Sequence, residues 1–162
     1  MENLHKVRAE ILESVSDLTD DQLNQVIEEG SWSIAQVLEH LYLMEENAVR
    51  LISHSLTLDE FEAPGTFPLH VVADRTKKIN APEFLMPANN FQTLDELKQK
   101  LATSRASLEK ISQETSEEDL NQKTFAHRRF GVLTLNQWIS LVGYHEQRHV
   151  GQIEDVKKAL IK

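Results

Sequence analysis

The C-terminal stretch of residues 135–160, LNQWISLVGYHEQRHVGQIEDVKKAL, decides how this chain folds. Its apolar side chains recur every three or four positions, at Leu135, Trp138, Ile139, Val142, Ile153, Val156 and Leu160. His145 and His149 continue the same stripe between Val142 and Ile153. This spacing is that of one face of an α-helix, so the stretch predicts a long helix that turns both imidazoles inward.

Three earlier segments have the same periodicity. Their apolar stripes run from Leu4 to Leu18, from Ile34 to Ile52 within a helix expected from Ser33 to Leu56, and from Leu94 to Ile111. No segment shows a strong strand pattern. Four amphipathic helices without a sheet predict an all-α protein with the architecture of a helical bundle.

A recurrent local signal marks where helices begin. Ser33–Gln36, Thr93–Glu96 and Thr134–Gln137 each fit the capping box, in which a hydroxyl and a side chain three residues later satisfy each other's backbone N–H groups. Thr19–Gln22 has the same form and predicts a short helix around Leu23 to Glu28 that ends at Gly30. Gly131 predicts a turn or short hairpin between Phe125 and Leu133.

A long connection separates the second helix from the third. Residues 57–92 contain all four prolines, and a short helix is expected there from Leu69 to Ile79. Connections of this length in compact domains are often functional or act as partly ordered lids. The segment could therefore shape access to a site.

The bulk composition limits the function. The 162 residues suit one domain, 1–162, and 40% of them are hydrophobic. A net charge of −9 without a basic stripe disfavours nucleic-acid binding. No apolar run approaches the roughly 18 residues that span a membrane, and the N-terminus lacks a signal-peptide pattern, which predicts a cytoplasmic protein. With no cysteine, any thiol chemistry needs an external thiol.

The histidines carry the strongest chemical signal. Side chains four positions apart on a helix have Cβ atoms about 6 Å apart, so His145 and His149 can reach one metal ion. His40 borders the apolar stripe of the second helix and adds a third ligand. Three neutral imidazoles with one open position describe a catalytic site for a zinc-like ion. His40 alone would be a hydrogen-bonded core residue. His5, His54 and His70 are expected on the surface or in loops. His127 could be a pocket residue, although an exposed loop position is favoured.

The stretch His145–His149 also fits the His-Glu-x-x-His motif of zinc peptidases. Such peptidases need a third ligand, usually well downstream, but only 13 residues follow His149 and Glu154 is their only glutamate. The peptidase interpretation is therefore disfavoured. Glu146 remains a possible general base, although a helix-surface carboxylate explains it equally well.

Three stretches together resemble the DinB-like (YfiT-like) superfamily: Ser31–Leu41, Gly131–Trp138 and His145–Ile153. The resemblance covers essentially the whole chain. It implies an up-down-down-up four-helix bundle, a zinc or nickel ion held by His40, His145 and His149, and a homodimer. Characterised relatives include transferases that use bacillithiol, mycothiol or glutathione, and some members are described as hydrolases.

The leading functional hypothesis is thus a metal-dependent transferase that adds a low-molecular-weight thiol to an electrophilic small molecule. A metal-dependent hydrolase is the enzymatic alternative, and a metal-stabilised bundle that acts as a sensor or interaction module is the non-enzymatic one. Arg148 and Gln152 lie near the ligands in sequence and could bind an anionic thiol, although ordinary helix-surface roles are favoured. The sequence identifies no further catalytic or cofactor-binding residue.

Overall fold

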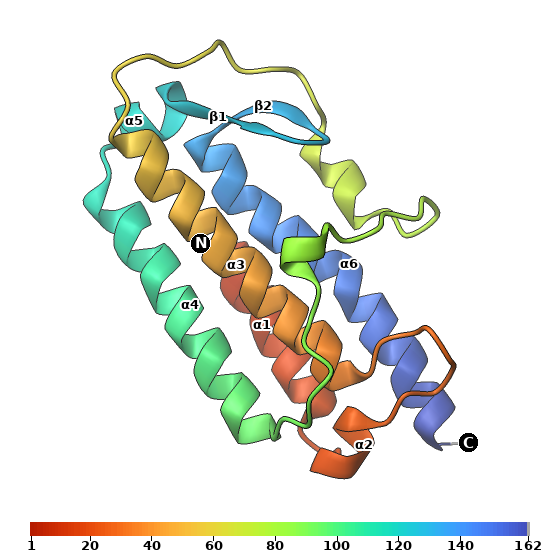
Figure 1. The fold of residues 1–162 in the computed structure, drawn as a ribbon. Helices are drawn as coiled ribbons and strands as arrows, with labels where there is room; N and C mark the ends of the chain where they lie inside the picture. Colours follow the sequence, from red (N-terminus) through yellow and green to blue (C-terminus); the bar gives the residue numbers. More distant parts are fainter. Residues whose placement is uncertain (162) are drawn as a thin grey trace.

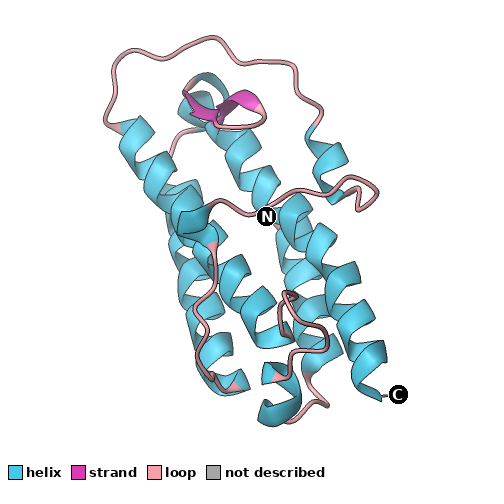
Figure 2. Ribbon diagram, turned by 45° about the vertical axis from the view of Figure 1, so that its right-hand side comes forward, coloured by secondary structure: helices cyan, strands magenta, loops and turns pink. Residues whose placement is uncertain are grey.

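The protein folds as a four-helix bundle, as the helical periodicity predicts. A computed structural model describes residues 1–161. The four long helices are α1 (Glu2–Val15), α3 (Ile34–Leu56), α4 (Leu94–Glu114) and α6 (Leu135–Ile161) (Figure 1). Helices α3 and α4 run in the same direction because the connection between them returns along the length of the bundle. This gives the up-down-down-up order, with one small hairpin as the only strands of the described chain (Figure 2).

The predicted capping boxes all form. At the start of α3, the Gln36 amide donates to the Ser33 hydroxyl at 3.1 Å and the Ser33 amide donates to the Gln36 side chain at 2.9 Å. Equivalent pairs begin α4 and α6. These boxes satisfy backbone N–H groups that a helix start otherwise leaves without partners.

The short helix after Thr19 begins earlier than predicted. Thr19 and Gln22 form the capping box, and α2 covers Asp20–Asn24. The expected range of Leu23 to Glu28 is wrong because the helix starts directly after its cap and Gln25 is already extended. Gly30, with φ of 81°, lies in the turn that follows.

The remaining short elements lie between the long helices. The connection contains two 3₁₀ turns, η1 (Leu69–Ala73) and η2 (Glu83–Leu85), so the helix expected from Leu69 to Ile79 is shorter than predicted. The short helix α5 (Glu117–Gln122) was not predicted from any sequence pattern. The predicted hairpin forms from β1 (Thr124–His127) and β2 (Gly131–Thr134), and Gly131 adopts the positive φ of 81° that its turn requires.

Backbone groups of the connection form hydrogen bonds with the bundle. The Gly65 N–H donates to the Val132 carbonyl at 2.8 Å, which places the connection beside β2. Arg148 on α6 donates to the carbonyls of Val72, Asp74 and Lys77 at 3.2, 2.5 and 2.5 Å. The connection therefore lies against α6, where η1 also packs.

A charged layer divides the core into two apolar clusters. One cluster includes Leu4, Met44, Leu108 and Val142; the other includes Val7, Leu41, Leu101 and Ile153. Between them, Arg8, Glu45, Arg105 and Glu146 come from the four long helices and pair with one another in the interior. No helix in the described chain is both long enough and apolar enough to cross a membrane.

Candidate metal centre

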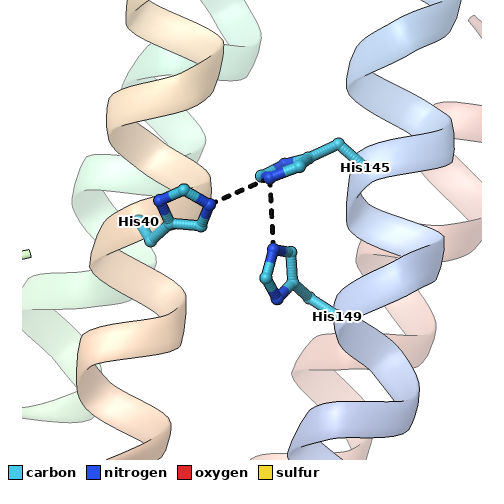
Figure 3. Close-up of side chains that lie close together, drawn as sticks. All are labelled: His40, His145 and His149. Atoms are coloured by element: carbon cyan, nitrogen blue, oxygen red, sulfur yellow. Dashed lines mark hydrogen bonds between the residues drawn. The ribbon is translucent and has the colours of Figure 1, made fainter. Parts of the chain in front are cut away.

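The structure brings the three predicted histidines together. His40 projects from α3, and His145 and His149 project from successive turns of α6 (Figure 3). The Nε2 atom of His145 lies 2.9 Å from that of His40 and 3.1 Å from that of His149. His40 is 3% exposed and His149 is 8% exposed, and His145 keeps more solvent contact than either.

Hydrogen bonds fix the protonation of two of the rings. The Nδ1 of His40 lies 2.8 Å from the Leu85 carbonyl, and the Nδ1 of His149 lies 2.7 Å from the side-chain oxygen of Gln152. Both oxygens only accept, so each Nδ1 must carry the hydrogen. The Nε2 atoms of His40 and His149 therefore present lone pairs towards His145.

This arrangement fits a metal ion. The Nε2 of neutral His145 can carry at most one hydrogen, which satisfies only one of the two facing lone pairs. Its Nδ1 is buried without a hydrogen-bond partner among the described residues. A cation would accept all three lone pairs. At bond lengths of about 2.0–2.1 Å, tetrahedral geometry separates ligand nitrogens by about 3.3 Å, a few tenths of an ångström more than here. No described carboxylate belongs to the group.

The surroundings keep the imidazoles neutral. Burial lowers the pKa of His149 to about 3, with a further contribution from His40. Burial also lowers the pKa of His145, well below its ordinary value, and that of His40, against the opposing hydrogen bond to Leu85. All three imidazoles are thus uncharged at neutral pH, and the uncharged ring is the form that binds metal ions.

Comparison with known proteins identifies the family. The model of the DinB superfamily matches residues 3–153. The chain belongs to the DinB superfamily.

Individual relatives agree with this assignment. The chain is 31% identical over 160 residues to the uncharacterised protein YuaE of Bacillus subtilis, and the match covers 99% of this chain and 98% of YuaE. It is 24% identical over 143 residues to a protein of Oceanobacillus iheyensis named "Putative metal-dependent hydrolase OB0413", covering 88% of this chain and 74% of that protein. The crystal structure of TT2238, a four-helix bundle protein, matches with a TM-score of 0.62 at 21% identity, covering 95% and 94% of the two chains; this likeness concerns the fold alone.

Glu146 does not face the centre of this DinB protein. Its carboxylate accepts from Arg8 at 3.0 Å and from Arg105 at 3.0 Å, within the charged layer, and the residue is 1% exposed. The helix turns neighbouring residues in different directions, so His145 points to the centre while Glu146 points into the core. The geometry contradicts both the peptidase arrangement and a helix-surface carboxylate.

The structure also places Arg148 and Gln152. The guanidinium of Arg148 is occupied by the three carbonyls of the connection, so it holds that segment rather than a ligand. Gln152 accepts from His149 and thereby orients a candidate metal ligand. Sequence reasoning had favoured ordinary surface roles for both side chains, and the structure assigns each a definite partner.

Two features near the centre differ from what the sequence favours. The carbonyl of Leu85 orients His40, but a backbone group carries no signal in the sequence. His127, expected as an exposed loop residue, is half-buried: its ring stacks on Phe130 with centroids 4.3 Å apart and lies 5.2 Å from Trp138. Its Nδ1 accepts from the backbone amides of Arg129 and Phe130. His5, His54 and His70 are exposed, as predicted.

Proposed function

We propose that this DinB protein is a metal-dependent enzyme that transfers a low-molecular-weight thiol to an electrophilic small molecule. The observation that carries the proposal is the convergence of three neutral imidazole nitrogens, two of which have lone pairs fixed by hydrogen bonds to Leu85 and Gln152. His40, His145 and His149 would hold a divalent transition metal, zinc or nickel. Three protein ligands leave an open coordination position, which is typical of catalytic sites.

No described carboxylate belongs to the histidine group, and this favours a thiol over water as the nucleophile. A bound divalent cation lowers the pKa of a thiol or water placed beside it. A free thiol has a pKa of about 8.5, whereas that of water is about 15.7. The thiol therefore needs less assistance in losing its proton. Glu146, the carboxylate next in sequence to His145, is held by Arg8 and Arg105 and cannot take a proton at the centre.

Neighbouring residues orient the three histidine rings for the reaction. Leu85 and Gln152 hold the rings, and η2 lies beside His40 on the connection. In the transfer, the thiol sulfur forms a bond to the electrophilic carbon, the leaving group departs with its electron pair, and the thiol proton passes to solvent. Because His145 is the most exposed of the three histidines, a small molecule would approach from its side.

Hydrolysis is the second candidate function. It is favoured by the name of the Oceanobacillus iheyensis relative, which describes a metal-dependent hydrolase. The same cation would then act on water instead of a thiol. The two reactions differ in whether an added thiol is consumed.

The test compares zinc-loaded, nickel-loaded and metal-stripped protein for consumption of glutathione, cysteine or bacillithiol with monochlorobimane as the electrophile. A p-nitrophenyl ester without thiol reports hydrolysis. We expect thiol consumption only with loaded protein, and its loss in His149→Ala. Ester hydrolysis without thiol transfer would overturn the transferase in favour of the hydrolase. Unfolding on chelation with neither activity would leave a metal-stabilised bundle.

A further inference from the structure

The exposed guanidinium of Arg128 lies over η2, the 3₁₀ turn that holds His40. Arg128 lies in the turn between β1 and β2, and its guanidinium carbon is 5.8 Å from the centroid of the Phe84 ring on η2. Both side chains are exposed, Phe84 by 54%. No described residue gives Arg128 a hydrogen bond or an ion pair. An aromatic face is a modest partner for a cation at an exposed site, so the guanidinium is available to an anion.

The neighbours of this contact place it next to the centre. Leu85, which follows Phe84, holds His40 through its carbonyl at 2.8 Å. Arg128 therefore reaches from the hairpin to η2, where Leu85 holds one candidate metal ligand, His40.

The hairpin turn that carries Arg128 is held in place. His127 accepts two backbone N–H groups, from Arg129 at 3.0 Å and from Phe130 at 3.2 Å. Its ring stacks on Phe130, which stacks in turn on Phe67 of the connection with centroids 4.6 Å apart. A turn fixed in this way presents its exposed arginine from a defined position, which reduces the entropy lost when a ligand binds.

Two guanidinium groups act on the candidate centre although the chain has a net charge of −9. Arg148 and Arg75 both contribute to the lowered pKa of His149, and Arg148 also to that of His145. Arg148 is occupied by backbone carbonyls and Arg75 pairs with Asp155 at 2.8 Å. Arg128, by contrast, has no hydrogen bond or ion pair to another residue of the described chain.

We propose that Arg128 determines specificity by binding an anionic group, a carboxylate or a phosphate, of the small molecule whose reacting atom reaches the metal centre. This inference rests on the proposed function. The anionic group can belong to the thiol or to the electrophile, since a guanidinium recognises both carboxylate and phosphate through paired N–H donors. The ring of Phe84 gives the guanidinium a cation–π contact at 5.8 Å within this site.

The experiment uses Co²⁺-loaded protein and two thiols as probes, mercaptosuccinate with two carboxylates and 2-mercaptoethanol with none. Binding is followed by the thiolate-to-cobalt charge-transfer absorption, which does not depend on turnover. In Arg128→Gln we expect the affinity for mercaptosuccinate to fall about fivefold to tenfold, as for the loss of one charge-assisted contact, while that for 2-mercaptoethanol is unchanged. Arg128→Lys should restore part of the difference, and added salt should reduce it.

Arg50→Gln is the matched control, because Arg50 is an exposed arginine on α3 that donates a hydrogen bond to Asn47 in its own helix. The specificity proposal is overturned, while the metal centre stands, if Arg128→Gln weakens both thiols equally. It is also overturned if the variant changes neither the affinity for mercaptosuccinate nor the inhibition of 2-mercaptoethanol binding by succinate and phosphate. An anion carried only by the electrophile is tested by inhibition of 2-mercaptoethanol binding with succinate and with phosphate in both proteins. Failure of Co²⁺ or of both thiols to bind the wild-type protein overturns the proposed function and this proposal together.

Discussion

Gln152 shows how a single side chain prepares the candidate metal centre. By accepting from Nδ1 of His149 at 2.7 Å, it fixes the tautomer that leaves Nε2 free. Outer hydrogen bonds of this kind typically change metal affinity by about 10–100-fold. We expect Gln152→Leu to lower zinc affinity by about that factor in competition with a chromophoric chelator. Gln147→Leu, at an exposed position of the same helix, should leave the affinity unchanged. Equal affinity in the two variants would contradict the positioning role.

His127 gives the protein a measurable dependence on pH. Burial, with help from Arg129 and Arg128, lowers its pKa to about 4, from an ordinary value of 6.5. Between these values the unfolded chain binds more protons than the native one. The contribution to the free energy of unfolding is therefore present above pH 6.5 and is lost as the pH falls towards 4. The imidazole resonance of His127, assigned by its absence in His127→Gln, should titrate near pH 4. A midpoint near 6.5 would place this ring in solvent.

The residues of the centre differ in how far the sequence reveals them. His145 and His149 share one helix, so their spacing alone predicts that they face the same way. His40 lies 105 positions from His145, and its place beside them depends on the packing of two helices. The carbonyl of Leu85 and the burial of His127 arise from tertiary structure, which no local pattern records. Glu146 illustrates the reverse case, because its motif suggests a base and the core pairs it with two arginines.

At the scale of elements, the connection between α3 and α4 depends on Arg148. Three backbone carbonyls accept from this one guanidinium, at Val72, Asp74 and Lys77. Hydrogen bonds to charged groups contribute about 1.5–3 kcal/mol in protein interiors, and a loss of only about 1 kcal/mol raises local opening about fivefold. We therefore expect trypsin to cleave the Arg148→Gln variant after Lys77 or Lys78 about fivefold faster than the wild-type protein. The helical circular dichroism should be unchanged. Lys98→Gln, on the exposed face of α4, is the control. Cleavage at the wild-type rate would show that other contacts hold the connection.

The helices themselves could be predicted where their signals are local. The capping boxes at Ser33, Thr93 and Thr134 involve residues three positions apart, so they can be read directly from the sequence. The ends of α2 and the short η1 depend on how the chain packs after the first turn, and their predicted bounds were wrong. The six-residue α5 has no buried side chain and no apolar stripe from which to predict it.

At the scale of the whole molecule, the charged layer links all four long helices. Glu45 is fully buried and accepts from Arg8 at 3.1 Å, from Arg105 at 2.7 Å and from Ser104 at 2.5 Å. Two arginines and two glutamates make the layer neutral. Removing one partner leaves an uncompensated buried charge, which typically costs about 3–5 kcal/mol.

Arg105→Met should therefore lower the free energy of unfolding in urea by about 3–5 kcal/mol. The double variant Arg105→Met/Glu146→Gln restores neutrality, so we expect it to be more stable than Arg105→Met alone. Equal or lower stability of the double variant would show that lost packing, rather than charge, dominates. The expected homodimer and cytoplasmic location stay predictions at this scale.

One cation shared by three imidazoles is the central feature of the proposed site, and the metal content of purified protein measures it. After loading with Zn²⁺ and dialysis, the wild-type protein and the exposed-site control His54→Ala should each retain about one ion per chain. The variants His40→Ala, His145→Ala and His149→Ala should stay helical and retain substantially less. A wild-type protein that cannot be loaded, or a His40→Ala variant that keeps one ion per chain, would contradict the account.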